Sequence, residues 1–234
     1  MVYWVAFGLL CAAVAGLSVG LFMTFSVVRV PSSGMAPTIS PGSSADFQRG
    51  GGSVVRGDVV LIQSPSGLLV RRVIGLPGDR VTCCDAAGRV DVNGKALVED
   101  YLLPGADPSL VPFAVTLRPG QVWVMGDNRA IAIDSRIWGP LTMSDIVGRV
   151  IQVSAAHGWT ELRTPATFIA DGLAPADDRF PLPFLLLILV GLALLAVIVQ
   201  GTAGIIRWAV RRRRRELRPQ PQTSSGWGGG GTYA

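Results

Sequence analysis

The sequence predicts an all-β domain of short antiparallel strands flanked by two transmembrane helices. Two runs without a charged residue, 2–28 and 180–206, each exceed the ~20 apolar residues that cross a bilayer. The mean hydropathy of +0.44 is too high for a purely soluble protein. Between the two runs, short apolar stretches alternate with turn residues, and no long helical period appears. This spacing favours antiparallel strands over an α/β arrangement.

The basic residues after the second apolar run set the expected topology. Arg207 and the arginines at 211–215 follow this run directly, and positive residues favour the cytoplasmic side of the cell membrane. Both termini are then cytoplasmic, and the β domain is extracytoplasmic. A cleaved signal peptide is the alternative for the first run, but that run has no basic n-region and is unusually long. The expected divisions are a transmembrane helix over 1–28, a β domain over 29–163, a linker over 164–182, a second transmembrane helix over 183–206 and a basic, disordered cytoplasmic tail over 207–234.

The elements between the spans are expected to be strands joined by turns and loops. Residues 30–39 contain two prolines, two serines and a glycine, which predicts a rigid, exposed turn. Residues 40–54 are polar and glycine-rich, which predicts a flexible loop. The Asn93-Gly94 pair is the strongest short hairpin signal. The predicted strands cover 59–62, 68–74, 80–84, 89–92, 113–117, 121–125 and 145–153, with a loop at 99–110 and a segment too polar for a core strand at 126–140.

Cysteine, histidine and charge patterns restrict the classes of site. Cys83 and Cys84 are adjacent, so a bond between them would close a strained ring, and ordinary packing with at least one side chain facing a core is expected. Cys11 falls in the first apolar run, and His157 is the only histidine. We therefore expect no metal and no cofactor. The arginine run is expected to anchor the topology and can bind membrane lipids, but it lacks the interleaved aromatic residues of a nucleic-acid site.

Three sequence blocks together carry a family resemblance. They read PSSGMAPT at 31–38, RRVIGLPGD at 71–79 and GDNRAIAIDSRIWGP at 126–140. They resemble the motifs PSGSMxPT, KRVIGLPGD and GDNRxxSxDSRxxGP of the type I signal peptidase family, over about 29–153. The resemblance implies a signal-peptidase-like β fold and cleavage of preproteins after a small-x-small segment. In that family a serine nucleophile gives its proton to a neutral lysine, and an extended substrate pairs with main-chain edges.

The chain departs from the family pattern at the positions of this chemistry. Gly34 occupies the nucleophile position and Arg71 occupies the general-base position. Glycine has no side chain for attack, and a guanidinium stays protonated in proteins. Ala132 replaces a serine that orients the lysine in the family. The resemblance therefore implies that the Ser/Lys dyad is lost.

Other family positions are kept in this chain. Ser32 matches a residue whose hydroxyl contributes to the oxyanion hole in some members. Asp134 and Arg136 match residues that support the lysine strand, although a simple scaffold salt bridge explains them equally well. The scaffold motifs are therefore retained while the catalytic and orienting positions are changed.

Ser33 is the fallback nucleophile, one residue from the family position. Neighbouring side chains of an extended chain point to opposite faces, so Ser33 is usable only if Gly34 absorbs a kink. A base is still missing. Lys95, the only lysine, follows the Asn93-Gly94 turn and is expected to be solvated, and His157 is expected to be structural.

The preferred interpretation is a membrane-anchored, signal-peptidase-like pseudopeptidase. It would bind signal peptides, preproteins or other extended peptides, or act as a partner of an active signal peptidase. The alternative is an active type I signal peptidase, a serine endopeptidase that uses Ser33. A third interpretation is a structural membrane protein without a peptide ligand. The residues that discriminate among these are Gly34, Arg71 and Ala132.

Overall fold

The structure is a computed structural model that describes residues 24–50, 53–109, 111–155, 158–175 and 182–216, with single positions 8, 12, 14, 16 and 20. The chain divides into two compact units, Ala15–Phe180 and a second unit of Met1–Val14 with Pro181–Ala234. Several parts of the sequence-based prediction lie wholly or mostly outside the described residues: the span over 1–28, Cys11, His157, the connection 176–181 and the tail from 217.

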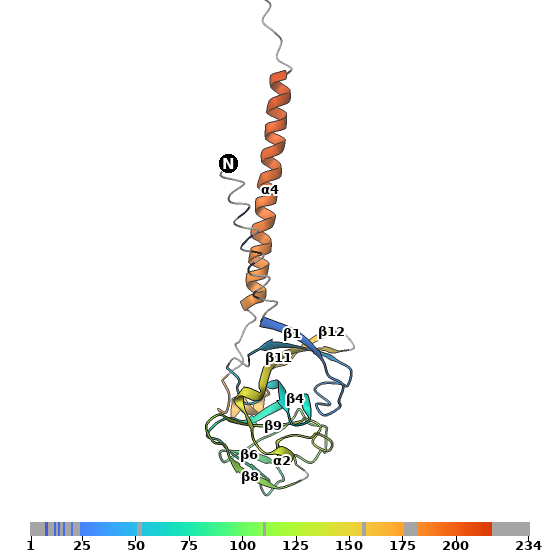
Figure 1. Ribbon diagram of the computed structural model, residues 1–234, viewed down its shortest axis with the longest axis vertical. Coiled ribbons are helices and arrows are strands. Elements are labelled where there is room, and N and C mark those ends of the chain that lie inside the picture. Colours follow the sequence, from blue (N-terminus) through green and yellow to red (C-terminus); the bar gives the residue numbers. More distant parts are fainter. Residues whose placement is uncertain are drawn as a thin grey trace, which may run out of the picture. The chain divides into compact units, whose positions relative to one another are not determined.

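The unit Ala15–Phe180 contains two antiparallel sheets (Figure 1). The larger sheet has the strand order β1-β2-β11-β3-β4-β9-β10, with β12 paired to β11, and the smaller has the order β7-β6-β5-β8. The prediction of mostly antiparallel β structure is thus confirmed. The elements are β1 Phe25–Arg29, β2 Ser44–Arg49, β3 Val59–Ser64, β4 Gly67–Gly75, β5 Arg80–Cys83, β6 Val90–Val92, β7 Lys95–Ala96, β8 Phe113–Thr116, β9 Gln121–Met125, α2 Ser135–Trp138, β10 Leu141–Thr142, η1 Met143–Asp145, β11 Ile146–Ala155, β12 Gly158–Glu161, α3 Ala166–Ala170 and α4 Leu182–Glu216.

The hairpin predicted at Asn93-Gly94 joins β6 to β7. Asn93 has φ +57° and Gly94 has φ +81°, the left-handed conformation that both central residues of a type I′ turn require. Val92 pairs with Lys95 across the turn. The hairpin prediction is confirmed because asparagine and glycine tolerate this backbone conformation better than other residues.

The loop predicted over 40–54 is wrong in its centre, where β2 pairs with both β1 and β11. Ala45 and Phe47 are 0% and 6% exposed, whereas Ser44, Asp46 and Gln48 are only partly buried. This alternation places one face of a short strand in the core, and it outweighs the glycines on either side. Likewise, β1 lies at Phe25–Arg29, where the first span was expected to end.

The first part of the expected linker over 164–182 belongs to the core. Phe168 of α3 is fully buried and packs in one apolar cluster with Leu117, Trp123 and Leu173. The Arg56 guanidinium donates to the carbonyl of Leu173 at 2.6 Å. A single buried residue in a helix of five residues leaves no periodic pattern, so the sequence does not predict that this helix packs in the core.

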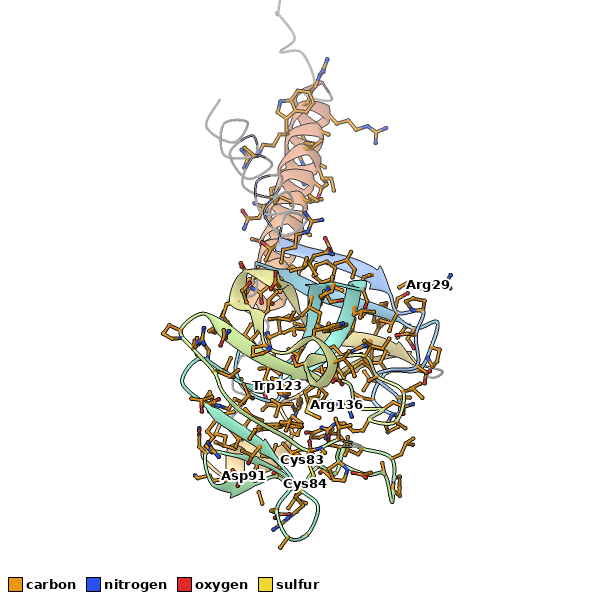
Figure 2. All side chains as sticks on the ribbon, turned by 60° about the horizontal axis from the view of Figure 1, so that its bottom comes forward. Arg29, Cys83, Cys84, Asp91, Trp123 and Arg136 are labelled. Atoms are coloured by element: carbon orange, nitrogen blue, oxygen red, sulfur yellow. A yellow bond between two sulfur atoms is a disulfide. The ribbon has the colours of Figure 1, made fainter. Side chains whose placement is uncertain are left out.

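Cys83 and Cys84 are joined by a disulfide bond, which corrects the expectation of ordinary packing (Figure 2). Their Cα atoms are 2.9 Å apart. Cys83 is buried at the end of β5, as expected for one of the pair, whereas Cys84 is exposed.

The helix α4 belongs to the second unit. Among the described residues, the segment Gly191–Arg214 is long and apolar enough to cross a membrane, with a mean hydropathy of 1.7. The helix continues beyond 206, where the tail was expected to begin, through the arginine run to Glu216. Arginine is a good helix former, which accounts for this extension.

Asp79 ties the turn between β4 and β5 to its surroundings. Arg56 donates to both carboxylate oxygens at 2.6 Å, and the Leu76 N–H and the Asn93 amide donate at 2.7 and 2.8 Å. Burial alone raises the pKa of Asp79, but these hydrogen bonds, led by those of Arg56, outweigh it and lower the pKa below its usual value. A lowered folded-state pKa stabilises the fold above the unfolded value of about 3.9, and this stabilisation is lost as pH falls through the folded-state pKa.

We expect Asp79→Asn to lower the free energy of unfolding by roughly 1.5–3 kcal/mol near neutral pH, because charge-assisted hydrogen bonds are lost. The deficit relative to wild type should shrink as the pH is lowered through about 4 to 2. Urea unfolding of the full chain in detergent at several pH values measures this difference in the free energy of unfolding. The exposed Asp100→Asn is the matched control, and a deficit at Asp79 that stays constant with pH would contradict the assignment.

Candidate functional site

The turn at 30–39 is held in place by buried apolar side chains. Val30, Met35 and Ile39 are 2%, 0% and 1% exposed and belong to one core cluster. The N–H of Ile39 donates to the carbonyl of Met35 at 2.9 Å. Ser32 and Ser33 are half-buried, and their hydroxyls have no hydrogen-bond partner among the described residues.

The structure brings Gly34 and Arg71 into contact. Arg71 lies on β4 and is 3% exposed. A Cβ atom added at Gly34 would lie 3.2 Å from Nη1 and 3.4 Å from both Cζ and Nη2 of Arg71. A side chain at position 34 would therefore be in tight contact with the guanidinium unless Arg71 moved by a few tenths of an ångström.

The Arg71 guanidinium is bonded only to backbone carbonyls among the described residues. Nε and Nη2 donate to the carbonyl of Ile133 at 3.0 and 2.8 Å, and Nη1 donates to the carbonyl of Val70 at 2.6 Å. A guanidinium has five N–H groups, so these three bonds leave two without an acceptor in the described chain. Burial lowers the pKa of Arg71, with Asp134 acting in the opposite direction, but the group remains a cation.

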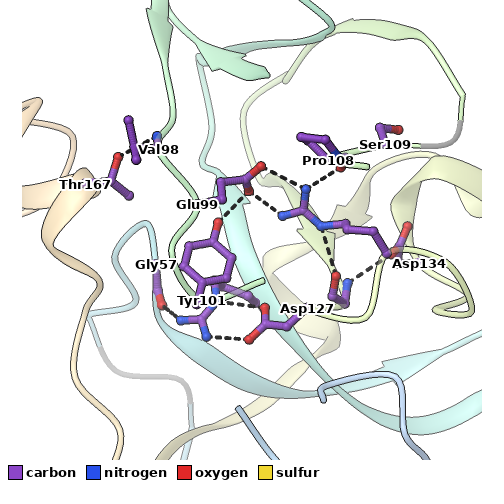
Figure 3. A network of polar contacts seen from close by, with 12 residues as sticks. Gly57, Val98, Glu99, Tyr101, Pro108, Ser109, Asp127, Asp134 and Thr167 are labelled. Carbon is purple, nitrogen blue, oxygen red and sulfur yellow. Dashed lines mark hydrogen bonds and ion pairs between the residues drawn. The ribbon is translucent and has the colours of Figure 1, made fainter. Parts of the chain in front are cut away.

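Three neighbouring arginines, in contrast, each have a carboxylate partner. Figure 3 shows the two pairs that involve Asp127 and Glu99. Arg72 makes two bonds to Asp127, at 2.9 and 2.6 Å, with side chains only 2% and 0% exposed. The other pairs are Arg129 with Glu99 and Arg136 with Asp134. Among the described residues, this cluster thus contains one more arginine than carboxylates, and Arg71 is the arginine without a salt bridge.

Asp134 and Arg136 fold the segment 126–136 back on itself. Asp134 caps α2, and its Oδ2 accepts the N–H of Gly126 at 2.9 Å and Nη2 of Arg136 at 2.8 Å. Arg136 also donates to the carbonyl of Arg129 at 2.9 Å. These bonds fix the position of the Ile133 carbonyl that accepts Arg71.

The folded segment packs directly on the turn that contains Gly34. The N–H of Asn128 donates to the carbonyl of Gly34 at 3.0 Å. A Cβ atom added at Gly126 would lie 2.5 Å from this carbonyl oxygen and 2.3 Å from Cβ of Ala132. Only glycine fits at 126, so the first and third sequence blocks meet at this point.

Sequence reasoning missed the contribution of the segment 99–110. The Tyr101 hydroxyl donates to Glu99 at 2.6 Å, and the guanidinium of Arg72 lies over the Tyr101 ring, 4.2 Å from its centroid. Thr38 donates to Asp127 at 2.5 Å. Thr38, Arg72 and Asp127 lie within the quoted blocks, whereas Glu99 and Tyr101 lie in an apparent loop that carries no motif.

The only lysine of the sequence is bonded outside the turn that carries Ser33. Lys95 lies on β7 in the smaller sheet, and its ammonium donates to the carbonyl of Asp171. No group of three or more His, Cys, Asp or Glu among the described residues is arranged to hold a metal ion.

Comparison with known proteins gives consistent matches. A family model described as "Signal peptidase, peptidase S26" matches residues 1–155. Signal peptidase I of Mycobacterium tuberculosis is 46% identical over 86 residues, which cover 33% of this chain and 29% of that protein. Signal peptidase I V of Bacillus subtilis is 32% identical over 136 residues, 51% of this chain and 80% of that protein. The chain therefore spans under a third of the mycobacterial relative and most of the Bacillus relative.

A solved structure is also similar in sequence. A crystal structure of a signal peptidase I from Enterococcus faecalis is 26% identical, with 43% of this chain and 98% of that chain covered and a TM-score of 0.37.

Proposed function

Because the chain belongs to the signal peptidase, peptidase S26, family, we propose that it is a pseudopeptidase that binds extended peptides, signal sequences above all, without cleaving them. The observation that carries this proposal is the contact between Gly34 and Arg71. Position 34 has no hydroxyl, and the group against it is a permanent cation that cannot accept a serine proton.

An open strand edge beside Arg71 supports peptide binding. β4 pairs with β3 from Gly67 onward, but its pairing with β9 begins only at Arg72. Val73 exchanges backbone bonds with Asp58 and Gly57 on the β3 side, so alternation directs the N–H and C=O groups of Val70 and Leu68 to the other side. The Val70 carbonyl there already accepts Nη1 of Arg71, which leaves the Val70 N–H and both groups of Leu68 for an added strand. An extended peptide can add to such an edge by main-chain pairing.

Exposed apolar side chains lie on the segment that contacts Arg71. Ile131 and Ile133 are 57% and 49% exposed, and the carbonyl of Ile133 accepts the Arg71 guanidinium. Apolar side chains in this position suit the apolar run of a signal sequence.

An active signal peptidase that uses Ser33 is the alternative proposal. The Ser33 hydroxyl is half-buried and has no hydrogen-bond partner among the described residues, which leaves it free to react. This alternative is weaker because it lacks an identified base for the Ser33 proton. The ammonium of Lys95 donates to the carbonyl of Asp171, and the described residues include no histidine.

We also propose a two-pass arrangement in the cell membrane, with α4 as the second span and the β domain on the extracytoplasmic side. The composition of Gly191–Arg214 and the arginines at its end support this orientation. Membrane lipids are then direct partners, and an active signal peptidase is a candidate protein partner.

Photo-crosslinking tests peptide binding by the full chain in detergent. The probe is a leucine-rich peptide that ends in Ala-Gln-Ala and carries a photoreactive group near its C-terminus. We expect crosslinks within 30–39 or 68–71, competition by excess unlabelled peptide, and no cleavage of the probe. Crosslinking that excess peptide does not reduce would contradict specific binding.

A proline at the open edge provides a matched pair of variants. Leu68 is 54% exposed, and Leu68→Pro removes a donor from the open side of β4, whereas Leu68→Ala keeps it. We expect crosslinking to fall several-fold in the proline variant and to remain near wild type in the alanine variant, with similar thermal unfolding in both. Equal crosslinking in both folded variants would show that the peptide does not use this edge.

A further inference from the structure

The excess positive charge beside Gly34 indicates which chemical group of a peptide ligand binds there. Arg72, Arg129 and Arg136 are neutralised by Asp127, Glu99 and Asp134, but Arg71 has no carboxylate partner among the described residues. It is nevertheless 3% exposed. The nearby carboxylates Asp134 and Asp127 are already paired with Arg136 and Arg72. A buried cation without a paired carboxylate is costly, so the site is electrostatically suited to an anion.

The donors that remain on Arg71 suit a carboxylate. Two of its five N–H groups lack an acceptor in the described chain, because the other three bind the carbonyls of Ile133 and Val70. A planar guanidinium binds a carboxylate by parallel hydrogen bonds, a geometry that an ammonium does not offer.

The Arg71 guanidinium lies where the end of a bound peptide is expected. The bond from Nη1 to Val70 places the guanidinium on the open side of β4, the edge to which an added strand would pair. The guanidinium also packs on Gly34. Because residue 34 is glycine, it has no side chain that could attack an uncut peptide. A peptide that pairs with this edge therefore reaches the Arg71 guanidinium. In active members of the family, the bond to be cleaved lies at this position.

We infer that the Gly34–Arg71 pair recognises the C-terminal carboxylate of a peptide that has already been cut, rather than an uncut preprotein. This inference rests on the proposed function and names its ligand class. The reaction that supplies such a ligand is hydrolysis of a peptide bond, which leaves a free carboxylate on the apolar fragment.

The test compares one leucine-rich peptide ending in Ala-Gln-Ala as the free acid and as the C-terminal amide. A third peptide, amidated and ending in aspartate, separates a side-chain carboxylate from the terminal one. Binding of fluorescent forms to the full chain in detergent is measured by anisotropy. We expect the free acid to bind about tenfold to a hundredfold more tightly than the amide, and the aspartate peptide to resemble the amide.

Two arginine variants provide the residue-level test. Arg71→Gln should abolish the preference, so that the acid and the amide bind with equal affinity whatever the absolute affinity of the variant. Arg118→Gln removes an equal charge from an exposed turn and should preserve the preference. Thermal unfolding of each variant establishes that it folds, and the comparison of peptides on wild-type protein needs no variant.

The outcomes separate this inference from the proposed function. Equal binding of acid and amide to wild type would overturn carboxylate recognition and leave peptide binding intact. If the amidated aspartate peptide bound as tightly as the free acid, recognition of the C-terminal carboxylate would be overturned. Failure of all three peptides to bind would overturn the proposed function together with the inference.

Discussion

A variant that carries Gly34→Ser together with Arg71→Lys is expected to cleave a signal-peptide substrate on the order of 10³-fold faster than wild type. Loss of a serine-protease nucleophile or base costs roughly 10⁶-fold, and an imperfectly placed dyad should recover part of this. The gain requires both changes. Serine supplies the hydroxyl, and a buried lysine can lose its proton, which a guanidinium cannot.

The contact geometry predicts how the single variants behave. A side chain at position 34 would begin 3.2 Å from Nη1 of Arg71, so Gly34→Ser alone should be crowded by the guanidinium and remain inactive. Arg71→Lys alone has no nucleophile at position 34. Gly34→Ala with Arg71→Lys is the matched control for the double variant.

Turnover is measured with a fluorogenic signal-peptide substrate and the purified full chain in detergent. The rate of the double variant should rise with pH, because the lysine must be neutral to act as a base. A double variant that shows wild-type thermal unfolding but no turnover would contradict a retained catalytic scaffold.

Asp127→Asn is expected to lower the free energy of unfolding by about 3–5 kcal/mol, because it leaves the Arg72 cation buried without its partner. Both side chains are almost completely buried, and Asp127 also accepts the Thr38 hydroxyl. The substitution therefore weakens the connection between the turn at 30–39, strand β4 and the segment that follows β9.

An exposed ion pair provides the matched control for this stability prediction. Glu161 pairs with Arg163, with side chains 56% and 76% exposed, so Glu161→Gln should cost at most about 1 kcal/mol. Denaturant unfolding of both variants makes the comparison. Equal, small losses at Asp127 and Glu161 would contradict the assigned importance of the buried network.

The sequence predicts the regular parts of this fold because their signals are local. The Asn93-Gly94 hairpin follows from backbone conformations that few residues tolerate. The apolar runs at β3 and β9 are recognisable because most of their side chains are buried. Strand β2 is not predicted because the polar, glycine-rich composition of 40–54 obscures the alternation that buries Ala45 and Phe47.

The parts of the site that sequence reasoning missed depend on contacts between distant segments. Glu99 neutralises Arg129, thirty positions away, from a segment without a motif. The direction of the Arg71 side chain is set by the carbonyl of Ile133, sixty-two positions away. Motifs identified Gly34 and Arg71 as positions of interest, but only the fold reveals that one is packed against the other.

Turnover of wild-type protein tests most directly whether the site has lost its chemistry. The substrate is the fluorogenic signal peptide, and Ser33→Ala is measured beside wild type in detergent at the same protein concentration. We expect both proteins to give the same rate as a blank without protein, while both still bind the peptide. Turnover by wild type that Ser33→Ala abolishes would contradict a pseudopeptidase and establish Ser33 as a working nucleophile.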